Sequence, residues 1–252
     1  MRREQGSRIR RPNARTLDLP PPFRLVMLRE VGDAFAHGCG HAAELGAGTL
    51  VFVGRFDLAE FAVVLEPDEP LASARRAFYA CMVALIDALA ATAPPEKPIV
   101  IEWPDAIYVD RGLVGGGRLG WPDHADERAP PDWLVFGAAI RTVSFSREES
   151  GLHPLSTALG DESFGDISSE RLVEGFARHL MVAVDRWQEG GFTHIAKEYI
   201  AKLKPGIGVR RDIGENGDLV VLRPGEVVEC RKLLPALNVP AWLDPGTGGP
   251  RL

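Results

Sequence analysis

The sequence predicts an α+β protein with a small β module at its C-terminal end. Strand-like runs occur in pairs, one before and one after the clearest helical segment. The helical segments repeat apolar residues every three or four positions, which is typical of helices that bury one face. Beyond Pro205 the sequence changes to short strand-like pieces separated by turn residues. Many functions share folds of this class, so the order of elements alone assigns none.

Length and composition limit the class of protein. The 252 residues, 45% of them apolar and 25% charged, are enough for one full core and a smaller appended domain. The net charge is -6, and beyond the first fifteen residues the sequence has no continuous basic stripe, so we expect no nucleic-acid partner. Charges interrupt the apolar stretches well short of the roughly 20 residues that cross a bilayer, so we expect no membrane partner either.

The number of cysteines and the character of the N-terminal residues both indicate the cellular compartment. Cys39, Cys81 and Cys230 are scattered and odd in number, which favours a reducing, cytoplasmic location over a disulfide framework. Residues 1–22 are rich in arginine, end in a proline triplet and lack the apolar core of a secretion signal, so we expect a disordered arm rather than a targeting peptide. Frequent Ala, Gly, Pro and Arg are typical of a GC-rich bacterial genome.

A helix, a hairpin and a long helix follow this arm. Asp33 is placed to cap a helix that ends near Gly46. TLVFVGR and EFAVVLEP then predict a β-hairpin over residues 49–66. Residues 70–92 predict one helix with an apolar face, formed by Leu71, Ala74, Phe78, Cys81, Met82, Leu85, Ile86 and Leu89.

The second half begins with another strand pair. IVIEW and IYVDRGLV are predicted strands, with a tight turn at Asp110, Arg111 and Gly112, and DWLVFGAAIRTVSF supplies a long central strand. Residues 168–191 and FTHIAKEYIAKLKPG predict two helices. IGVRRDI, DLVVLRPG and VVECRKLL form the terminal β module, and the tail LNVPAWLDPGTGGPRL is too rich in Pro and Gly for regular structure.

The stretch IEWPDAIYVDRGLVGGGRLGWP, residues 101–122, resembles the signature of the biotin/lipoate protein ligase family. In that family a strand ends in K-W-P-N-D, runs through a short hairpin and returns through K-x-x-G. Trp103 and Pro104 match the first motif, and Gly115 falls on the family glycine. AVVLEP, FGAAIRT and GGFTHIAKEYIAKL resemble further family segments in the same order, so the resemblance extends from about residue 24 to 204.

The resemblance implies a fold and a chemistry. The fold is a ligase-like mixed sheet flanked by helices over residues 23–204, with a small SH3-like module and tail over 205–252. Family members join the carboxylate of biotin or lipoate to AMP and pass the acyl group to a lysine. The implied cofactors are ATP with Mg²⁺ and biotin or lipoate. The implied partners are a small carboxylic acid and a biotinyl or lipoyl carrier domain.

This sequence departs from the family at its charged positions. Glu102 and Gly112 replace the two signature lysines, and Asp105 and Ala106 replace the Asn-Asp pair. Joining two anions requires positive charge, which those lysines supply. A close charge is worth about 4 kcal/mol in a partly solvated site, so the replacement of a lysine by Glu102 opposes standard adenylation.

Arginines are the residues that could compensate. The place of the family's nucleotide-covering loop holds only VGRFD, with Arg55 as its cation, and Arg141 stands at the asparagine of the G-x-G-x-N strand. Arg111 and Arg118 lie on the signature hairpin, where a solvated tip and a strand edge are the alternative readings. Arginine binds phosphate and carboxylate in a bidentate manner, so Arg55 and Arg141 are the stronger candidates.

The glycine triplet 115–117 is predicted to expose backbone N–H groups as a nest for a carboxylate, with a β-bulge or strand twist as the alternative. Trp103 would line the pocket or belong to the core. The predicted ligand-binding set is Arg55, Trp103, Pro104, Asp105, Gly115, Gly116, Gly117, Arg118 and Arg141.

Arg141 and Cys39 are the weak catalytic candidates. Cys39 lies in HGCGH, residues 37–41, whose two histidines are spaced for one helix face. A zinc site there lacks a further ligand, so helix surface is the preferred interpretation and we predict no metal. Cys39 would serve as an acyl-carrying nucleophile only in an ATP-independent transferase.

The sequence therefore favours a protein of a divergent ligase-like branch that acts on, or at least binds, a biotin-like or lipoyl/octanoyl carboxylic acid, with transfer to a protein lysine as the ancestral reaction of the branch. Two alternatives stay open: a non-catalytic relative that binds or senses such an acid, and an ATP-independent acyltransferase.

Overall fold

The computed structural model describes residues 17–144, 155–165 and 167–252. Most of the expected N-terminal arm, residues 1–16, lies outside the described residues. Its last part is not detached as expected, because Leu17 and Leu19 pack against the core and Asp18 pairs with Arg178 at 2.8 Å. None of the described helices has the length and apolar character to span a membrane.

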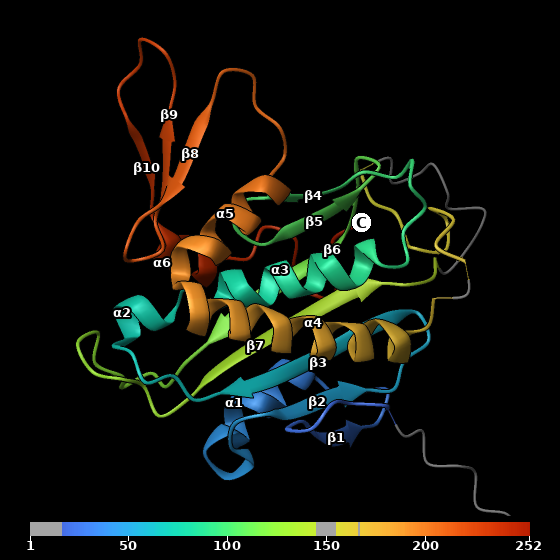
Figure 1. Cartoon of the computed structure of the whole chain (residues 1–252). Coiled ribbons are helices and arrows are strands. Elements are labelled where there is room, and N and C mark those ends of the chain that lie inside the picture. The colour runs from blue at the N-terminus through green and yellow to red at the C-terminus, as the bar shows by residue number, and fades with distance from the viewer. Residues whose placement is uncertain (1–16, 145–154, 166) are drawn as a thin grey trace, which may run out of the picture.

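A seven-stranded mixed sheet forms the centre of the protein (Figure 1). Its spatial order is β1-β2-β3-β7-β6-β5-β4. β1 and β2 are parallel, and every other neighbouring pair is antiparallel. The strands are β1 Arg24–Leu28, β2 Thr49–Val53, β3 Leu58–Leu65, β4 Ile99–Glu102, β5 Ala106–Val109, β6 Gly112–Gly120 and β7 Leu134–Arg141. The predicted mixed sheet is confirmed. β1 was not predicted, because it is a short edge strand whose parallel partner β2 is separated from it by a helix.

Helices cover both faces of this sheet. α1 (Ala34–Leu45) packs on one face, and α3 (Ala77–Ala90), α4 (Ser169–Gly190) and α5 (Phe192–Lys202) lie on the other. Figure 1 shows α3 and α4 side by side in front of the strands. Asp33 caps α1 through Ala36 N–H, and Gly46 ends the helix with a φ of 72°, as predicted.

The single helix expected over residues 70–92 is in fact two, α2 (Leu71–Ala74) and α3. Arg75 lies at the break, and its side chain is buried against Trp121 and Glu127 of the following loop. Backbone oxygens of the same loop accept hydrogen bonds from the first turn of α2: Leu71 N–H donates to Ala129 O, and Ala72 N–H donates to Glu127 O. Contacts with a distant loop therefore override the helical periodicity.

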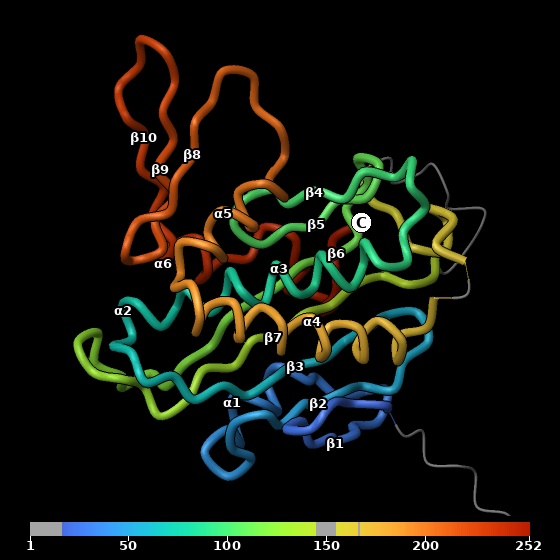
Figure 2. The backbone as a smooth tube through the Cα atoms, in the orientation of Figure 1, coloured from blue at the N-terminus to red at the C-terminus, as the bar shows by residue number. Residues whose placement is uncertain are grey.

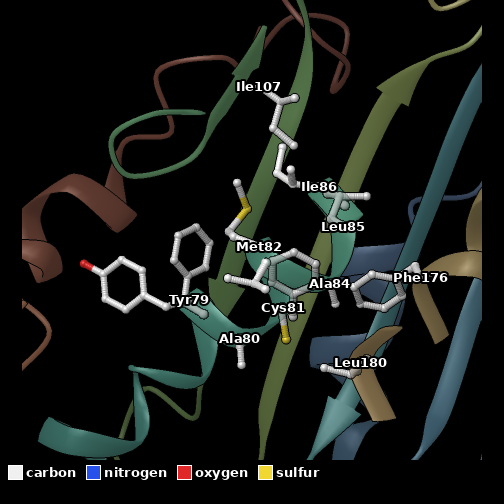
Figure 3. Packing of buried hydrophobic residues seen from close by; sticks show 14 of the residues in the cluster. Tyr79, Ala80, Cys81, Met82, Ala84, Leu85, Ile86, Ile107, Phe176 and Leu180 are labelled. Atoms are coloured by element: carbon white, nitrogen blue, oxygen red, sulfur yellow. The ribbon is translucent and has the colours of Figure 1, made fainter. Parts of the chain in front are cut away.

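The α3 helix is buried on nearly all sides (Figure 3). Its residues pack against β5 and β6 on one side and against α4 on the other, where Phe176 and Leu180 face the sheet. Phe176 stacks on Phe136 of β7 with ring centroids 5.7 Å apart. Burial of this kind supplies most of the stabilising free energy of such a domain.

The C-terminal module is a three-stranded antiparallel sheet that projects beyond the main sheet (Figure 2). It comprises β8 (Arg210–Ile213), β9 (Leu219–Leu222) and β10 (Glu229–Arg231). The predicted third strand is shorter than expected, because α6 (Leu233–Asn238) begins directly after it and buries Leu233 and Leu237. From α6 the chain returns to the main sheet.

Candidate functional site

Strand β6 carries the glycine triplet in the interior of the sheet. Alternation along the strand directs Gly116, Arg118 and Gly120 to the face that α1 also covers. Gly117 faces the opposite side, where an added Cβ would lie 2.7 Å from Met82 Sδ. At Gly115, with a φ of 150°, an added Cβ would lie 1.9 Å from the backbone oxygen of Ala139. The glycines therefore allow close packing of strands and side chains.

The predicted N–H nest does not form, because the triplet is paired on both sides. On one side, Gly115 pairs with Ile107 and Gly116 with Ala106, both on β5. On the other side, the two glycines pair with Ile140 and Ala139 of β7. Gly117 N–H donates to the backbone oxygen of Asp105 at 3.1 Å. The strand register shifts between Ile107 and Tyr108, in agreement with the alternative reading of the triplet as a bulged, twisted strand.

The Trp-Pro pair of the signature forms hydrogen bonds with α3 and α5. Trp103 Nε1 donates to the hydroxyl of Tyr79 at 3.2 Å, and Tyr199 donates its hydroxyl to Pro104 O at 2.7 Å. Trp103 lines a small pocket of about 190 Å³ together with Glu102 and Lys204, and neither Trp103 nor Pro104 lines the larger cavity of about 860 Å³ beside Arg118. In this structure the pair fastens the β4–β5 hairpin to α3 and α5.

Asp105 is buried on the opposite face, beneath the C-terminal segment 239–252. Its Oδ2 accepts the N–H of Ala241 at 3.2 Å, whereas Oδ1 has no hydrogen-bond partner among the described residues. Burial raises the pKa of this carboxyl group to about 7. The position that resembles the family asparagine therefore holds a group that titrates near neutral pH.

Arg55 and Arg141 lie together at one end of the sheet, apart from Arg118. Arg55 forms a bidentate pair with Asp57, with distances of 3.2 and 2.7 Å. Arg141 donates to the backbone oxygen of Pro250 at 2.8 Å, and burial lowers its pKa. Both of the arginines that the sequence favoured for a ligand are therefore engaged within the protein.

A cavity of about 860 Å³ opens at the C-terminal end of β6. It lies between α1, the 121–133 loop, α6 and the residues that follow α6, and its volume falls in the range of about 300 to 1,000 Å³ that holds small molecules. Its apolar wall is formed mainly by Phe35, Leu119, Trp121, Trp133, Leu237 and Leu243. This wall suits a ligand with a compact apolar body.

The polar wall of the cavity holds Arg118 and Arg75. The Arg118 guanidinium carbon lies 4.2 Å from the Phe35 ring centroid, and one N–H group donates to Asp33 Oδ1 at 3.0 Å. Guanidinium carries five N–H groups, and the other four of Arg118 have no acceptor among the described residues. Arg75 is paired with Glu127 and stacks on Trp121 at 5.0 Å. Arg118 is therefore the cation better able to receive a ligand.

Cys39 lines the same cavity but lacks the features of a nucleophile. Burial raises the pKa of its thiol to about 11, in spite of the nearby Arg118, so the thiol is protonated at neutral pH. His37 and His41 stack on each other at 4.4 Å on α1. The described residues contain no group of three His, Cys, Asp or Glu side chains that could hold a metal ion.

The residues that the family uses for adenylation have no counterpart at this site. Glu102 is half-exposed and lies 3.8 Å from Lys204, and Gly112 is packed against Thr157. The turn between β2 and β3 spans only residues 54–57, and its Arg55 is held by Asp57. These residues do not fit an ATP phosphate chain.

Most of the residues that surround this cavity were not predicted from the sequence. Arg75, Trp121 and Trp133 line the cavity, and Trp242 is 1% exposed beneath the sheet. A tryptophan within the Pro/Gly-rich tail was the available signal, because an indole in an irregular segment usually marks a buried anchor. Arg75 gave no signal, since its role depends on a loop that follows it by about fifty residues.

The chain matches one protein-family model and several solved structures. A sequence model described as the Biotin/lipoate A/B protein ligase family matches residues 19–201. Curated proteins give no match. Among solved structures, a biotin protein ligase-like protein of unknown function from Silicibacter sp. TM1040 is 29% identical, with a TM-score of 0.74, over 88% of this chain and 99% of that chain.

Two biotin protein ligases share the fold at lower identity. The Aquifex aeolicus enzyme in complex with biotin and ATP is 16% identical, with a TM-score of 0.62, over 82% of this chain and 94% of that chain. The Leishmania major enzyme in complex with biotinyl-5-AMP is 14% identical, with a TM-score of 0.54, over 84% of this chain and 99% of that chain.

Proposed function

The chain belongs to the biotin/lipoate A/B protein ligase family, and on that premise we propose that it binds a small carboxylic acid without joining it to AMP. The acid is of the biotin or lipoyl/octanoyl class, with a carboxylate and a compact apolar body. Arg118 receives the carboxylate, and the aromatic wall of the 860 Å³ cavity receives the body.

The observation that carries this proposal is the placement of Arg118. The residue lies on the signature strand β6, one alternation beyond Gly116, and its side chain enters the wall of the cavity. Phe35 packs against the guanidinium group, and among the described residues Asp33 alone accepts one of its N–H groups. An arginine fixed by stacking loses little conformational entropy when it pairs with a carboxylate.

Charge in the rest of the wall limits the affinity of this site. Asp123 and Glu127 also line the cavity and Asp33 pairs with Arg118, so its two arginines are opposed by three carboxylates. A ligand with one negative charge fits this balance better than a polyphosphate does. This is a further reason to favour a free monocarboxylic acid over a nucleotide as the ligand.

We favour binding of the acid over its ligation to AMP, because the positive charge that adenylation requires is missing. Glu102 and Gly112 stand at the two signature lysines, and Arg55 is neutralised by Asp57. Transfer of the acyl group to a lysine of a carrier domain would need an activated acid from another source. An ATP-independent transfer through Cys39 is supported only by its place in the cavity wall.

Isothermal titration calorimetry with octanoate, lipoate and biotin tests the proposal. At least one acid should bind, and Arg118→Ala should weaken binding by about tenfold or more, because it removes a charge-assisted pair of about 1.5–3 kcal/mol. Arg111→Ala, at the exposed hairpin tip, is the matched control and should leave the affinity unchanged.

Two further measurements separate binding from catalysis. Added ATP and Mg²⁺ should neither tighten acid binding nor yield an acyl-AMP mass by mass spectrometry. Formation of acyl-AMP would overturn the non-ligating part of the proposal. Absence of binding for all three acids would overturn the whole of it, and an acyl adduct lost in Cys39→Ser would establish the transferase alternative instead.

A further inference from the structure

The C-terminal segment 239–252 is irregular in sequence but fixed in position. It leaves α6 and runs along the face of β5 and β6 opposite α3 (Figure 1). Trp242 is 1% exposed, and Pro250 is the other buried residue of the segment. Most of its remaining residues are exposed, so attachment depends on a few contacts.

These contacts fall on residues that the sequence assigned to a ligand. Trp242 Nε1 donates to Gly117 O at 3.0 Å, and Ala241 N–H donates to Asp105 Oδ2 at 3.2 Å. Arg141 donates to Pro250 O at 2.8 Å. The segment thus places an indole ring, a backbone N–H and a backbone oxygen where a ring-bearing ligand would present its own groups.

The indole occupies space that glycine leaves open on the strand. A Cβ added at Gly116 would lie 2.4 Å from Trp242 Cδ1, so the ring lies directly against the backbone of β6. Two positions further along the same face, Arg118 enters the cavity wall, and Leu243 of the segment forms part of that wall. The cavity and the space filled by Trp242 are therefore neighbouring parts of one strand face.

Resting on the proposed function, we propose that segment 239–252 is an intramolecular plug that competes with the acid for this face of β6. In the docked state Trp242 fills the glycine-lined part and leaves only the cavity beside Arg118. Displacement of Trp242 lengthens the groove along Gly116. The acid then binds the undocked state more tightly than the docked state.

The competition has a quantitative consequence. If the open state is populated at a fraction f, the apparent dissociation constant is the intrinsic constant divided by f. A segment docked about 99% of the time would weaken the apparent affinity by up to about 100-fold, and by less to the extent that the docked state binds the acid in the cavity beside Arg118. Loss of the indole anchor should recover much of that factor, and bound acid should release the segment.

Hydrogen exchange on the full-length wild-type protein is the first test. Leu243, Asp244 and Arg251 each donate an N–H within the segment, to Pro240 O, Gly249 O and Trp242 O, so docking protects these amides. Saturating octanoate should speed their exchange by about tenfold or more and leave the amides of α3 unchanged. Unchanged protection at saturation, with octanoate bound, overturns the plug and leaves the proposed function intact.

Calorimetry of full-length variants is the second test. Trp242→Ala should tighten octanoate binding by about tenfold or more, and Trp242→Phe, which loses the N–H donor to Gly117 O and part of the ring but keeps an aromatic side chain, should tighten it less. Trp187→Phe, on α4, is the control and should have no effect. Equal affinities in all four proteins overturn the plug, whereas no binding in any of them, including a folded Trp242→Ala, overturns the proposed function itself.

Discussion

Asp105 shows how burial converts an ordinary carboxyl group into one that titrates near neutral pH. The side chain is 1% exposed and its pKa rises from 3.8 to about 7. The other titratable side chains close to it are Tyr108 on β5 and Tyr199 on α5, whose pKa values burial also raises. Neither tyrosine is charged between pH 4 and 9, so the local response to pH in this range belongs to Asp105.

This shift predicts a pH-dependent stability. The folded protein retains the Asp105 proton where the unfolded chain has lost it, so the stabilising contribution is full below pH 3.8 and is lost as the pH rises through about 7. Each pKa unit corresponds to about 1.4 kcal/mol. Asp105→Asn keeps the acceptor for Ala241 N–H and should flatten this dependence by about 2 kcal/mol or more.

Urea unfolding of wild type and Asp105→Asn at pH 5 and pH 8.5 measures the effect. Asp132→Asn, at an exposed position, controls for the loss of one negative charge. Equal pH slopes for wild type and Asp105→Asn would show that the Asp105 carboxyl group is not the source of the dependence.

At the scale of a single element, β6 is constrained by its backbone rather than by its side chains. Gly115→Ala should destabilise the protein by about 3 kcal/mol or more, because the new Cβ would lie 1.9 Å from Ala139 O at a φ of 150°. Gly40→Ala is the matched control: its Cβ meets nothing within 4 Å on helix α1, so it should stabilise by about 1 kcal/mol.

Thermal unfolding followed by circular dichroism compares the two alanine variants. A Gly115→Ala protein as stable as wild type would mean that β5, β6 and β7 shift apart easily. The glycine triplet would then need a reason other than close packing.

At the scale of the whole molecule, the C-terminal module shares the core of the main domain. Ile213, Leu219 and Leu233 pack in the same hydrophobic cluster as α3, and Tyr79 donates its hydroxyl to Gly217 O at 2.5 Å. The segment after α6 then contacts β6. We therefore expect the module and the main domain to unfold together, despite the change of composition at Pro205.

Differential scanning calorimetry tests this cooperativity. One transition is expected, with equal calorimetric and van't Hoff enthalpies. Tyr79→Phe should lower the stability of the single transition by about 1–2 kcal/mol, because Gly217 O loses its donor and Trp103 Nε1 loses its acceptor. Two transitions, with only the smaller one moved by Tyr79→Phe, would show that the module folds on its own.

The sequence by itself determined the elements whose signals are local. The cap at Asp33, the stop at Gly46 and the turn at Asp110 and Arg111 depend on backbone preferences of a few adjacent residues, and all appear where predicted. The Trp-Pro motif and the order of segments around it were enough to identify the family, which the match over residues 19–201 shows. Alternating and helical periodicities similarly gave the strand pairs and helices of the sheet.

Tertiary structure alone decided which residues meet. No local pattern pairs Arg75 with Glu127, places Trp242 against Gly116, or separates Arg118 from Arg55 and Arg141. These outcomes depend on contacts between residues far apart in the chain, and side-chain burial and pairing are properties of the assembled fold. The glycine triplet is therefore a packing surface and not the predicted nest, because strand pairing engages its backbone groups.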